Sequence, residues 1–507
     1  MASNPAPATP IPFSSMKSLF LTTSLLALAA TSALNAQDLP TAETSLFRVN
    51  ITSQGWNFYV PWQKVNPGTR RGLGALLEGN RVLVTAELAQ DATYIELEHA
   101  DTGRKITAKV EFVDYECDLA TLVAAEEPGD FFEGKKPLAL QTTAKPKDQF
   151  EVWQFENNGS AVVTPLTFTK ADLGEYFLEG ERFLTYEASG PVQYRAGTFT
   201  LPVVKEGKLV GMLLSYSAKD QVAQILPSVI VQHFLDDAKD GHYEGFPQFG
   251  MKSAPTLDKQ FRSFLKLDGQ DGGIYVSRVM PDSSVEAAGI KSGDVVLEIN
   301  GYKIDSRGNY VSPEYGLLPL GHLIKGGSEV GDVIKVKIWR NGAPMEMDLT
   351  LKRRDISKNL VDPYLFDRGP RYLILGGLIF QELTDPYLGD NERRQRAPFM
   401  LTYAQENPEK FLAEGRKKLI FLSGILPAES NQGYERMNGL IVTNVNGTFI
   451  TDIKALDEAL KHPTDGIHKI EFQEFPKVIY IDAAQAQKDN EETMPTRYRI
   501  TEMQRLE

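Results

Sequence analysis

The chain has 507 residues, of which 42% are apolar and 24% charged, a composition typical of a globular protein with several domains. Its formal net charge of −13 disfavours nucleic acid or an anionic membrane surface as a partner, because both favour a basic face. The one cysteine, Cys117, excludes an intramolecular disulfide.

The N-terminus has the layout of an exported protein. The stretch "MKSLFLTTSLLALAATSALNAQ" begins at Met16 with one lysine, continues with an apolar run too short to span a bilayer, and ends in small residues before Ala36. We therefore expect a signal peptide within residues 1–36, with Met16 as an alternative start, and export to a bacterial periplasm. An N-terminal membrane anchor is the alternative interpretation.

Residues 46–234 contain many short apolar stretches, such as "RVLVTAEL", "QFEVWQF" and "KLVGMLLSYS", separated by Gly, Asn and Pro. Stretches of this length and spacing indicate an antiparallel barrel or sandwich. The segment "LPSVIVQHFLDDAKDG" then has apolar residues at steps of three and four, which predicts a helix that ends before Gly241.

Two later units, residues 249–352 and 372–481, share one order of elements. Each has a strand, an Asn-Gly turn and a strand, at Asn300-Gly301 and Asn446-Gly447, followed by a helical stretch and another strand. Asn-Gly supplies the positive φ values that a tight hairpin needs. The repeated order predicts a diverged internal repeat.

Aromatic residues are dense ahead of the glycine-rich segment of the predicted barrel, in "LFRVNITSQGWNFYVPWQKVNPG". We expect this stretch to lie before the barrel. Trp56, Phe58, Tyr59 and Trp62 suit either an oligomer contact or a contribution to the core.

The middle unit carries a specific resemblance. "GGIYVSRVMPDSSVEAAGIKSGDVVLEINGYKI" is similar to the PDZ domains of the HtrA/Deg serine proteases, and the third unit resembles the second PDZ-like domain of plant-type Deg proteases. The resemblance implies a mainly β chain, with a trypsin-like double β-barrel at residues 42–238 and two α+β PDZ domains at 246–355 and 370–485. A C-terminal tail would follow at 486–507.

The resemblance also implies where a catalytic triad would lie. The histidine position of the family, in "VLVTAELA", is Glu87; the aspartate in "DYECDLATL" is retained as Asp118; the serine position, in "GTFTLPV", is Phe199. Serine attack needs a hydroxyl, an imidazole and a carboxylate, and Thr200 and Leu201 replace two glycines of the loop that forms the oxyanion site. We therefore predict that the barrel is catalytically inert and that Asp118 caps a turn.

Other chemistry is less favoured by the residues. Ser189 in "EASGPV" partly resembles a nucleophile loop, and it keeps open the alternative of an active serine endopeptidase, although a simple turn explains it better. His99 fits a hairpin turn and Cys117 a buried core position. No group of residues has zinc-ligand spacing and no phosphate loop is present, so we expect no metal and no cofactor.

If the barrel is inert, function must come from the PDZ units. A PDZ domain adds a peptide as a strand to an open sheet edge, and loop amides hold its C-terminal carboxylate. The family writes this loop as an aromatic or Leu, Gly and an aliphatic residue, and Phe249, Gly250 and Met251 match it. His322 lies where PDZ domains read an upstream ligand residue, or else it is an exposed helix-cap residue.

In the third unit, Leu375-Gly376-Gly377-Leu378 offers a comparable loop, for which an internal interface is favoured over a free peptide site. Together these features predict an exported pseudoprotease that binds peptide C-termini or unfolded proteins as a scaffold, holdase or regulator. From the family we expect a trimer-based homo-oligomer, or a mixed oligomer with an active Deg paralogue.

Overall fold

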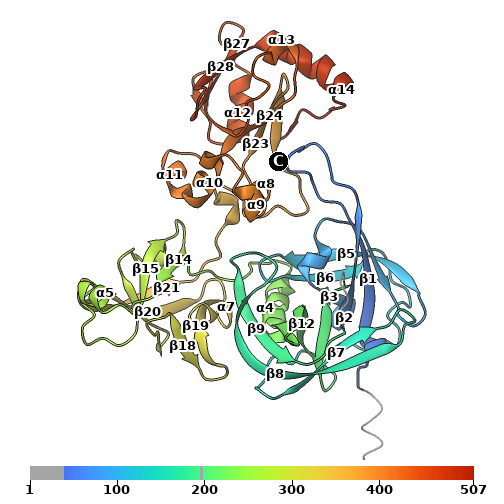
Figure 1. The fold of residues 1–507 in the computed structure, drawn as a ribbon. Coiled ribbons are helices and arrows are strands. Elements are labelled where there is room, and N and C mark those ends of the chain that lie inside the picture. Colours follow the sequence, from blue (N-terminus) through green and yellow to red (C-terminus); the bar gives the residue numbers. More distant parts are fainter. Residues whose placement is uncertain (1–38, 194–197) are drawn as a thin grey trace, which may run out of the picture.

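The computed structural model describes residues 39–193 and 198–507. The predicted signal peptide at residues 1–36 lies outside this range. Figure 1 shows a double barrel, a middle unit beside it, and a C-terminal unit above both. Within the described residues, no helix is both long enough and apolar enough to cross a bilayer.

The first barrel closes because β1 pairs with both β4 and β2, giving the ring β1-β4-β5-β6-β3-β2. Alternate residues of β1, Phe47, Val49 and Ile51, point into its core. Its elements are α2 (Ala42–Ser45), β1 (Leu46–Ser53), β2 (Gly68–Leu77), η1 (Glu78–Asn80), β3 (Arg81–Val84), α3 (Ala86–Ala89), β4 (Ala92–Glu98), β5 (Lys105–Asp114), β6 (Leu119–Ala124) and β10 (Thr198–Phe199).

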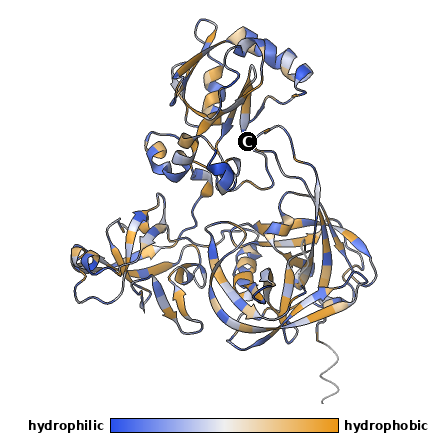
Figure 2. Ribbon diagram, in the orientation of Figure 1, coloured by the Kyte–Doolittle hydropathy of each residue, from blue (hydrophilic) through white to orange (hydrophobic). Residues whose placement is uncertain are grey.

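The second barrel is the closed ring β11-β12-β13-β9-β8-β7. Its core contains Phe150, Phe168 and Tyr186, whose rings pack against one another. Figure 2 shows apolar residues along the strands of both barrels. The double barrel that the resemblance implied is thus confirmed. Its elements are β7 (Gln149–Phe155), β8 (Ala161–Glu175), β9 (Arg182–Ser189), β11 (Leu201–Lys205), β12 (Lys208–Ser217), β13 (Val222–Pro227), α4 (Ser228–Asp237) and η2 (Ala238–Asp240).

The middle unit is a sheet in the order β14-β15-β16-β20-β21. Its predicted Asn-Gly hairpin is confirmed, with φ of 48° at Asn300 and 82° at Gly301 between β16 and β17. Its elements are β14 (Met251–Ala254), α5 (Lys259–Phe264), β15 (Ile274–Val279), α6 (Ser284–Ala287), β16 (Val295–Ile299), β17 (Tyr302–Lys303), β18 (Asn309–Ser312), β19 (Gly316–Pro319), α7 (His322–Lys325), β20 (Val333–Arg340) and β21 (Ala343–Thr350).

The third unit repeats this order with additions, in a sheet β28-β27-β25-β24-β23-β22-β29, and η3 (Ile356–Lys358) lies in the linker before it. The predicted tail is part of this sheet, because β29 pairs with β22. Its elements are β22 (Tyr372–Leu375), β23 (Leu378–Glu382), α8 (Asp385–Leu388), α9 (Asn391–Arg394), α10 (Phe399–Glu406), α11 (Pro408–Ala413), β24 (Ile420–Ile425), η4 (Glu429–Asn431), β25 (Leu440–Val445), β26 (Thr448–Phe449), α12 (Ile453–Leu460), β27 (Ile467–Phe472), β28 (Val478–Asp482), α13 (Ala483–Lys488), η5 (Asp489–Thr493), α14 (Met494–Arg497) and β29 (Gln504–Arg505).

The sequence predicted that the aromatic stretch lies before the barrel, and this prediction is wrong. Its first part is barrel strand β1, and residues 54–67 form a long loop that reaches the third unit beside the C-terminus (Figure 1). The guanidinium of Arg505 lies 3.8 Å from the Trp56 ring centre, and the Tyr59 hydroxyl donates to the Tyr387 carbonyl at 3.0 Å. These aromatic residues therefore join two parts of one chain.

Candidate functional site

The retained aspartate of the triad region binds the backbone. Asp118 follows β5, is 2% exposed, and its Oδ1 accepts a hydrogen bond from the backbone N–H of Glu87 at 2.8 Å. Thr85, the N-cap residue of α3, makes no side-chain cap bond, so Asp118 supplies the acceptor that this helix start needs. Burial raises the pKa of Asp118 well above its usual range.

Glu87, at the histidine position of the family, is half-buried in α3. Burial raises the pKa of its carboxyl group, and the nearby charge of Arg70 opposes that rise. The Arg70 Nη1 atom donates to the Glu87 carbonyl at 2.9 Å and to the Gln90 carbonyl at 3.2 Å. Arg70 thus holds the carbonyl end of this short helix.

The loop that should carry a nucleophile is held against the first barrel. In β10, Phe199 pairs with Gly72 of β2 in parallel. Thr200 has φ of 47°, a left-handed conformation that is strained for a β-branched residue. Its Oγ1 donates to the Leu73 carbonyl at 2.7 Å, and the Leu73 N–H donates to the Thr200 carbonyl at 3.3 Å.

A cavity of about 370 Å³ opens between the two triad-equivalent acids and the second barrel. Asp172, Glu175 and Glu187 also line it, and no imidazole or basic side chain does so among the described residues. The lining also includes Ser215 of β12, which no nucleophile motif in the sequence marks. Serine chemistry requires a proton acceptor with an orienting partner, and an acidic cavity of this kind offers no imidazole.

The other serine considered from the sequence lies elsewhere. Ser189 is the last residue of β9, is exposed, and pairs through its backbone with Thr167 and Val222. It does not line the cavity of Glu87 and Asp118. Its side chain makes no hydrogen bond within the described part of the chain.

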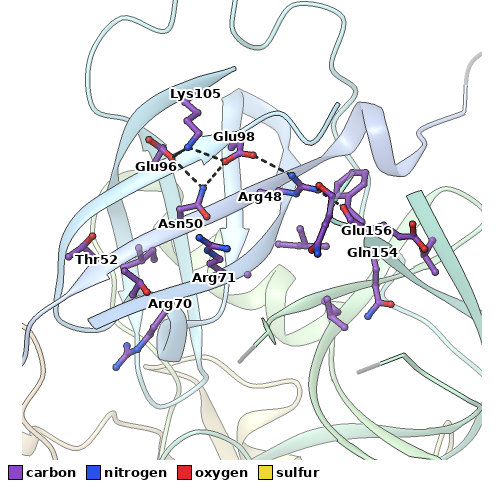
Figure 3. Close-up of a pocket in the computed structure, with 18 of the residues that line it drawn as sticks. Arg48, Asn50, Thr52, Arg70, Arg71, Glu96, Glu98, Lys105, Gln154 and Glu156 are labelled. Carbon is purple, nitrogen blue, oxygen red and sulfur yellow. Dashed lines mark hydrogen bonds and ion pairs between the residues drawn. The ribbon is translucent and has the colours of Figure 1, made fainter. Parts of the chain in front are cut away.

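A larger cavity, of about 660 Å³, lies where β1, β2 and β4 face the end of β7 (Figure 3). Part of its charge is paired within the chain. Arg48 pairs with Glu98 at 3.4 Å, Lys105 pairs with Glu96 at 2.7 Å, and the Asn50 amide donates to Glu98 at 3.0 Å. This network is a strand-bridging surface and holds no arrangement of nucleophile and base.

The predicted carboxylate-binding loop of the middle unit depends on a glycine. Gly250 has φ of 83°, and a Cβ at this position would lie 2.2 Å from the Ser283 Cβ. Within the described chain, the backbone N–H groups of Phe249 and Gly250 have no acceptor. The strand that follows is β14, with Met251 at its start. Among the residues that the structure describes it pairs with β15 alone, and its other edge has no partner strand there. Free loop amides beside a free strand edge are what peptide addition requires.

His322 lies at the start of α7, against the second barrel. Its Nδ1 is hydrogen-bonded to the Tyr310 hydroxyl at 2.5 Å, and the neighbouring Tyr315 hydroxyl lies 3.0 Å from that of Tyr186 in β9. Burial lowers the pKa of His322 to about 4, so the imidazole is neutral near pH 7. The imidazole therefore belongs to the joint between barrel and middle unit.

The comparable loop in the third unit is a hairpin turn. Leu375 pairs with Leu378, and Gly376 and Gly377, with φ of 53° and 85°, form the turn between β22 and β23. The Gly376 N–H already donates to the Asn490 side chain at 2.8 Å. By its place in the sheet, β23 of the third unit corresponds to β14 of the middle unit. The edge that has no partner strand in β14 is paired with β22 in β23, and α12 packs against β22. The loop is thus occupied by contacts within the chain, as in the internal interface that the sequence analysis favoured over a free peptide site.

The other two residues considered from the sequence, His99 and Cys117, are part of the packed interior. His99 is buried, and its Nε2 lies 2.9 Å from the Phe131 carbonyl. Cys117 is fully buried, and burial raises the pKa of its thiol. In the parts of the chain that the structure covers, no three His, Cys, Asp or Glu side chains are grouped as metal ligands would be.

Residues 361–504 and residues 248–309 each match a family profile described as PDZ domain. The chain is 25% identical over 437 residues to protease Do-like 2, chloroplastic, of Arabidopsis thaliana, covering 85% of this chain and 70% of that protein. It is 24% identical over 301 residues to the periplasmic serine endoprotease DegP of Escherichia coli, covering 57% and 58%. A solved structure, the HtrA-type protease AlgW with decapeptide, is 15% identical with a TM-score of 0.47, covering 62% of this chain and 96% of that one.

Proposed function

We propose that this chain, a homologue of the HtrA/Deg proteases with two PDZ domains, binds peptides or misfolded proteins and does not cleave them. The single observation that carries the proposal is the contrast between two sites. The triad region has an acid at the histidine position and a strained, bonded loop at the serine position. The first PDZ domain has free loop amides beside a free strand edge.

The loss of cleavage rests on the chemistry of three positions. Glu87 can accept a proton, but Asp118, which should orient an imidazole, accepts the Glu87 amide instead. Phenylalanine at position 199 has no hydroxyl to deprotonate. The oxyanion loop would need to turn its amides toward substrate, whereas Thr200 bonds to Leu73 in β2.

Peptide binding is assigned to the first PDZ domain. A bound C-terminus would pair with the free edge of β14, and its carboxylate would accept hydrogen bonds from the amides of Phe249 and Gly250. In the second PDZ domain the corresponding edge carries β22 and the loop amide of Gly376 is bonded to Asn490. The second domain then serves assembly of the chain and not ligand capture.

The proposed setting is the periplasm, supported by the leader-like sequence before residue 37. The similar proteins carry names from more than one compartment, one chloroplastic and one periplasmic. A trimer-based homo-oligomer, or a mixed oligomer with an active paralogue, is the proposed assembly state. The proposed role of this binding site is that of a scaffold, a holdase or a regulator.

Two measurements on the purified full chain test the proposal. A serine-reactive fluorophosphonate probe should leave the protein unlabelled, and casein should remain intact, in the wild type and in Ser189→Ala and Ser215→Ala variants. A C-terminal peptide array should give hits that a fluorescence-polarisation titration reproduces. Casein turnover that is lost in either serine variant would favour the active endopeptidase instead. No binding to any peptide would overturn the assignment of the first PDZ domain.

A further inference from the structure

Two basic residues lie side by side on the first two strands of the first PDZ domain. Lys252 of β14 is directly opposite Arg278 of β15 in the antiparallel register. Residues at opposite positions project from the same face of the sheet, so like charges there repel one another and weaken the strand pair. Such a pair is unfavourable unless anionic groups lie beside it.

The anion for Arg278 comes from the second PDZ domain. The Arg278 guanidinium forms an ion pair with the Glu409 carboxylate of α11. Lys252 has no equivalent partner. Its side chain is exposed, and within the described part of the chain its ammonium makes no ion pair or hydrogen bond. The chain itself therefore neutralises one of the two cations and leaves the other facing solvent.

Lys252 also lies on the strand to which the proposed ligand is added. Among the described strands, β14 pairs with β15 alone. If the amides of Phe249 and Gly250 hold the C-terminal carboxylate, the last residue of the peptide lies opposite Met251 and the penultimate residue lies opposite Lys252. Because opposite residues share a face of the sheet, the penultimate side chain of the ligand lies beside Lys252.

Alternation along the strand separates this face from the one that meets the apolar C-terminal residue. The last and the third-last side chains of the peptide project from the face opposite to that of Lys252. On that face Met251 packs, partly buried, against the core of the domain. The penultimate side chain points away from this apolar region, so a charged head group there stays in water while it meets the Lys252 ammonium.

We propose that Lys252 is a specificity-determining residue, which selects peptides that carry an acidic residue immediately before an apolar C-terminal residue. The inference rests on the proposed function of the first PDZ domain and names the class of ligand that this domain takes. A glutamate or aspartate at the penultimate position supplies the anion that Lys252 lacks. A lysine or arginine there meets like charges from Lys252 and from Arg278 on the next strand, and is disfavoured.

Fluorescence polarisation with labelled peptides tests this selection in the full chain. Three peptides share an apolar C-terminal residue with a free carboxylate and differ only at the penultimate position, which is Glu, Gln or Lys. The Glu peptide should bind about two- to fivefold more tightly than the Gln peptide, the range that an exposed ion pair spans, and the Lys peptide should bind most weakly. The preference should shrink at high salt, because the ion pair lies at the surface.

A fourth peptide checks the register. It keeps Gln at the penultimate position and carries Glu at the third-last position. That side chain projects from the face opposite to that of Lys252, so this peptide should bind no more tightly than the Gln peptide.

Two variants of Lys252 assign the preference to this residue. Lys252→Gln should abolish the preference for Glu over Gln, and Lys252→Glu should reverse it, so that the Lys peptide binds best. The matched control is Lys303→Gln on β17, which removes another exposed lysine that makes no ion pair within the described chain and lies on a strand paired with β16. This control should bind all four peptides as the wild type does.

The outcomes separate this inference from the proposed function. Equal or reversed affinities for the Glu, Gln and Lys peptides, tighter binding of the fourth peptide, or a Glu preference that survives Lys252→Gln would overturn the selection by Lys252 and leave peptide binding intact. Loss of the preference in Lys303→Gln would do the same. If no peptide with an apolar C-terminus binds at all, the proposed function of the first PDZ domain fails, and the inference fails with it.

Discussion

The backbone amide of Glu87 donates a hydrogen bond to the carboxylate of Asp118 at 2.8 Å. In a working triad, the carboxylate would instead hold the imidazole of the residue at the Glu87 position. Here the same two positions remain in contact, but the acid stabilises the start of a short helix. A position that looks catalytic in the sequence is therefore structural in the fold.

Replacing Asp118 separates these two roles. Asp118→Ala removes the acceptor for Glu87 and should lower the free energy of unfolding by about 1–2 kcal/mol, the usual cost of losing a helix-start acceptor. Asp118→Asn keeps an acceptor oxygen in a side chain of nearly the same shape, so it should cost less than the alanine variant. Urea denaturation of both variants measures the difference. Equal losses in the two variants would show that the acceptor oxygen is not what stabilises this helix start.

Thr200 is a second residue whose conformation can be tested. Its φ of 47° is strained, and its Oγ1 bond to Leu73 offsets that strain. Thr200→Gly loses the bond but relieves the strain, whereas Thr200→Ala loses the bond and keeps most of the strain. The alanine variant should therefore be the less stable of the two by about 1 kcal/mol, the left-handed penalty of a residue with a Cβ. Urea midpoints that place alanine level with glycine would contradict this account.

The repeated hairpins were predictable because their signal is local. Asn300-Gly301 and Asn446-Gly447 each supply two adjacent residues that accept positive φ, and both form turns. The Gly376-Gly377 pair is ambiguous for the same reason. Two glycines suit a carboxylate-binding loop and a two-residue hairpin equally, and only the pairing of Leu375 with Leu378 distinguishes them.

The contacts between domains could not be predicted in this way. Asp91 and Asp367 lie 276 residues apart, and nothing in the sequence around either residue indicates the other. The long β1–β2 loop was misplaced for a related reason. Trp56 and Tyr59 have the composition of an interface, but composition does not state which surface they meet. The triad positions could be predicted because a motif fixes them, whereas the contact between Asp91 and Asp367 depends on how whole domains are arranged.

Glu116 lies at the joint between the barrel and the first PDZ domain. Its burial predicts that the free energy of unfolding depends on pH. It is 1% exposed beside Asp114 and Arg353, and burial raises its pKa to about 7, against the attraction of Arg353. The pKa of a glutamate in an unfolded chain is about 4.3. Between that pH and about 7, the folded chain therefore holds a proton that the unfolded chain releases. Stability contributed by this group is present at low pH and is lost as the pH rises through the window.

Glu116→Gln should remove that slope. At pH 8 the variant should be more stable than the wild type by about 1–3 kcal/mol, and at pH 4 the two should be nearly equal. Guanidinium denaturation at several values between pH 4 and pH 8 measures the effect. The control is Glu298→Gln, a half-buried glutamate of β16 away from this joint, which should leave the slope as in the wild type. A wild-type stability that rises across the window would contradict the assignment.

The edge of β14 gives the sharpest test of peptide binding. Met251→Glu places a carboxylate beside the free amides of Phe249 and Gly250, where it would repel the C-terminal carboxylate of a peptide, so affinity should fall about tenfold or more. Met345→Glu makes the same chemical change on β21, at the opposite end of the sheet, and should bind as the wild type does. Fluorescence polarisation with a labelled peptide that ends in an apolar residue measures both affinities. The same peptide with an amidated C-terminus should bind weakly to the wild type and should be insensitive to Met251→Glu. Equal weakening by the two glutamate variants, or tight binding of the amidated peptide, would remove the carboxylate from the recognition scheme.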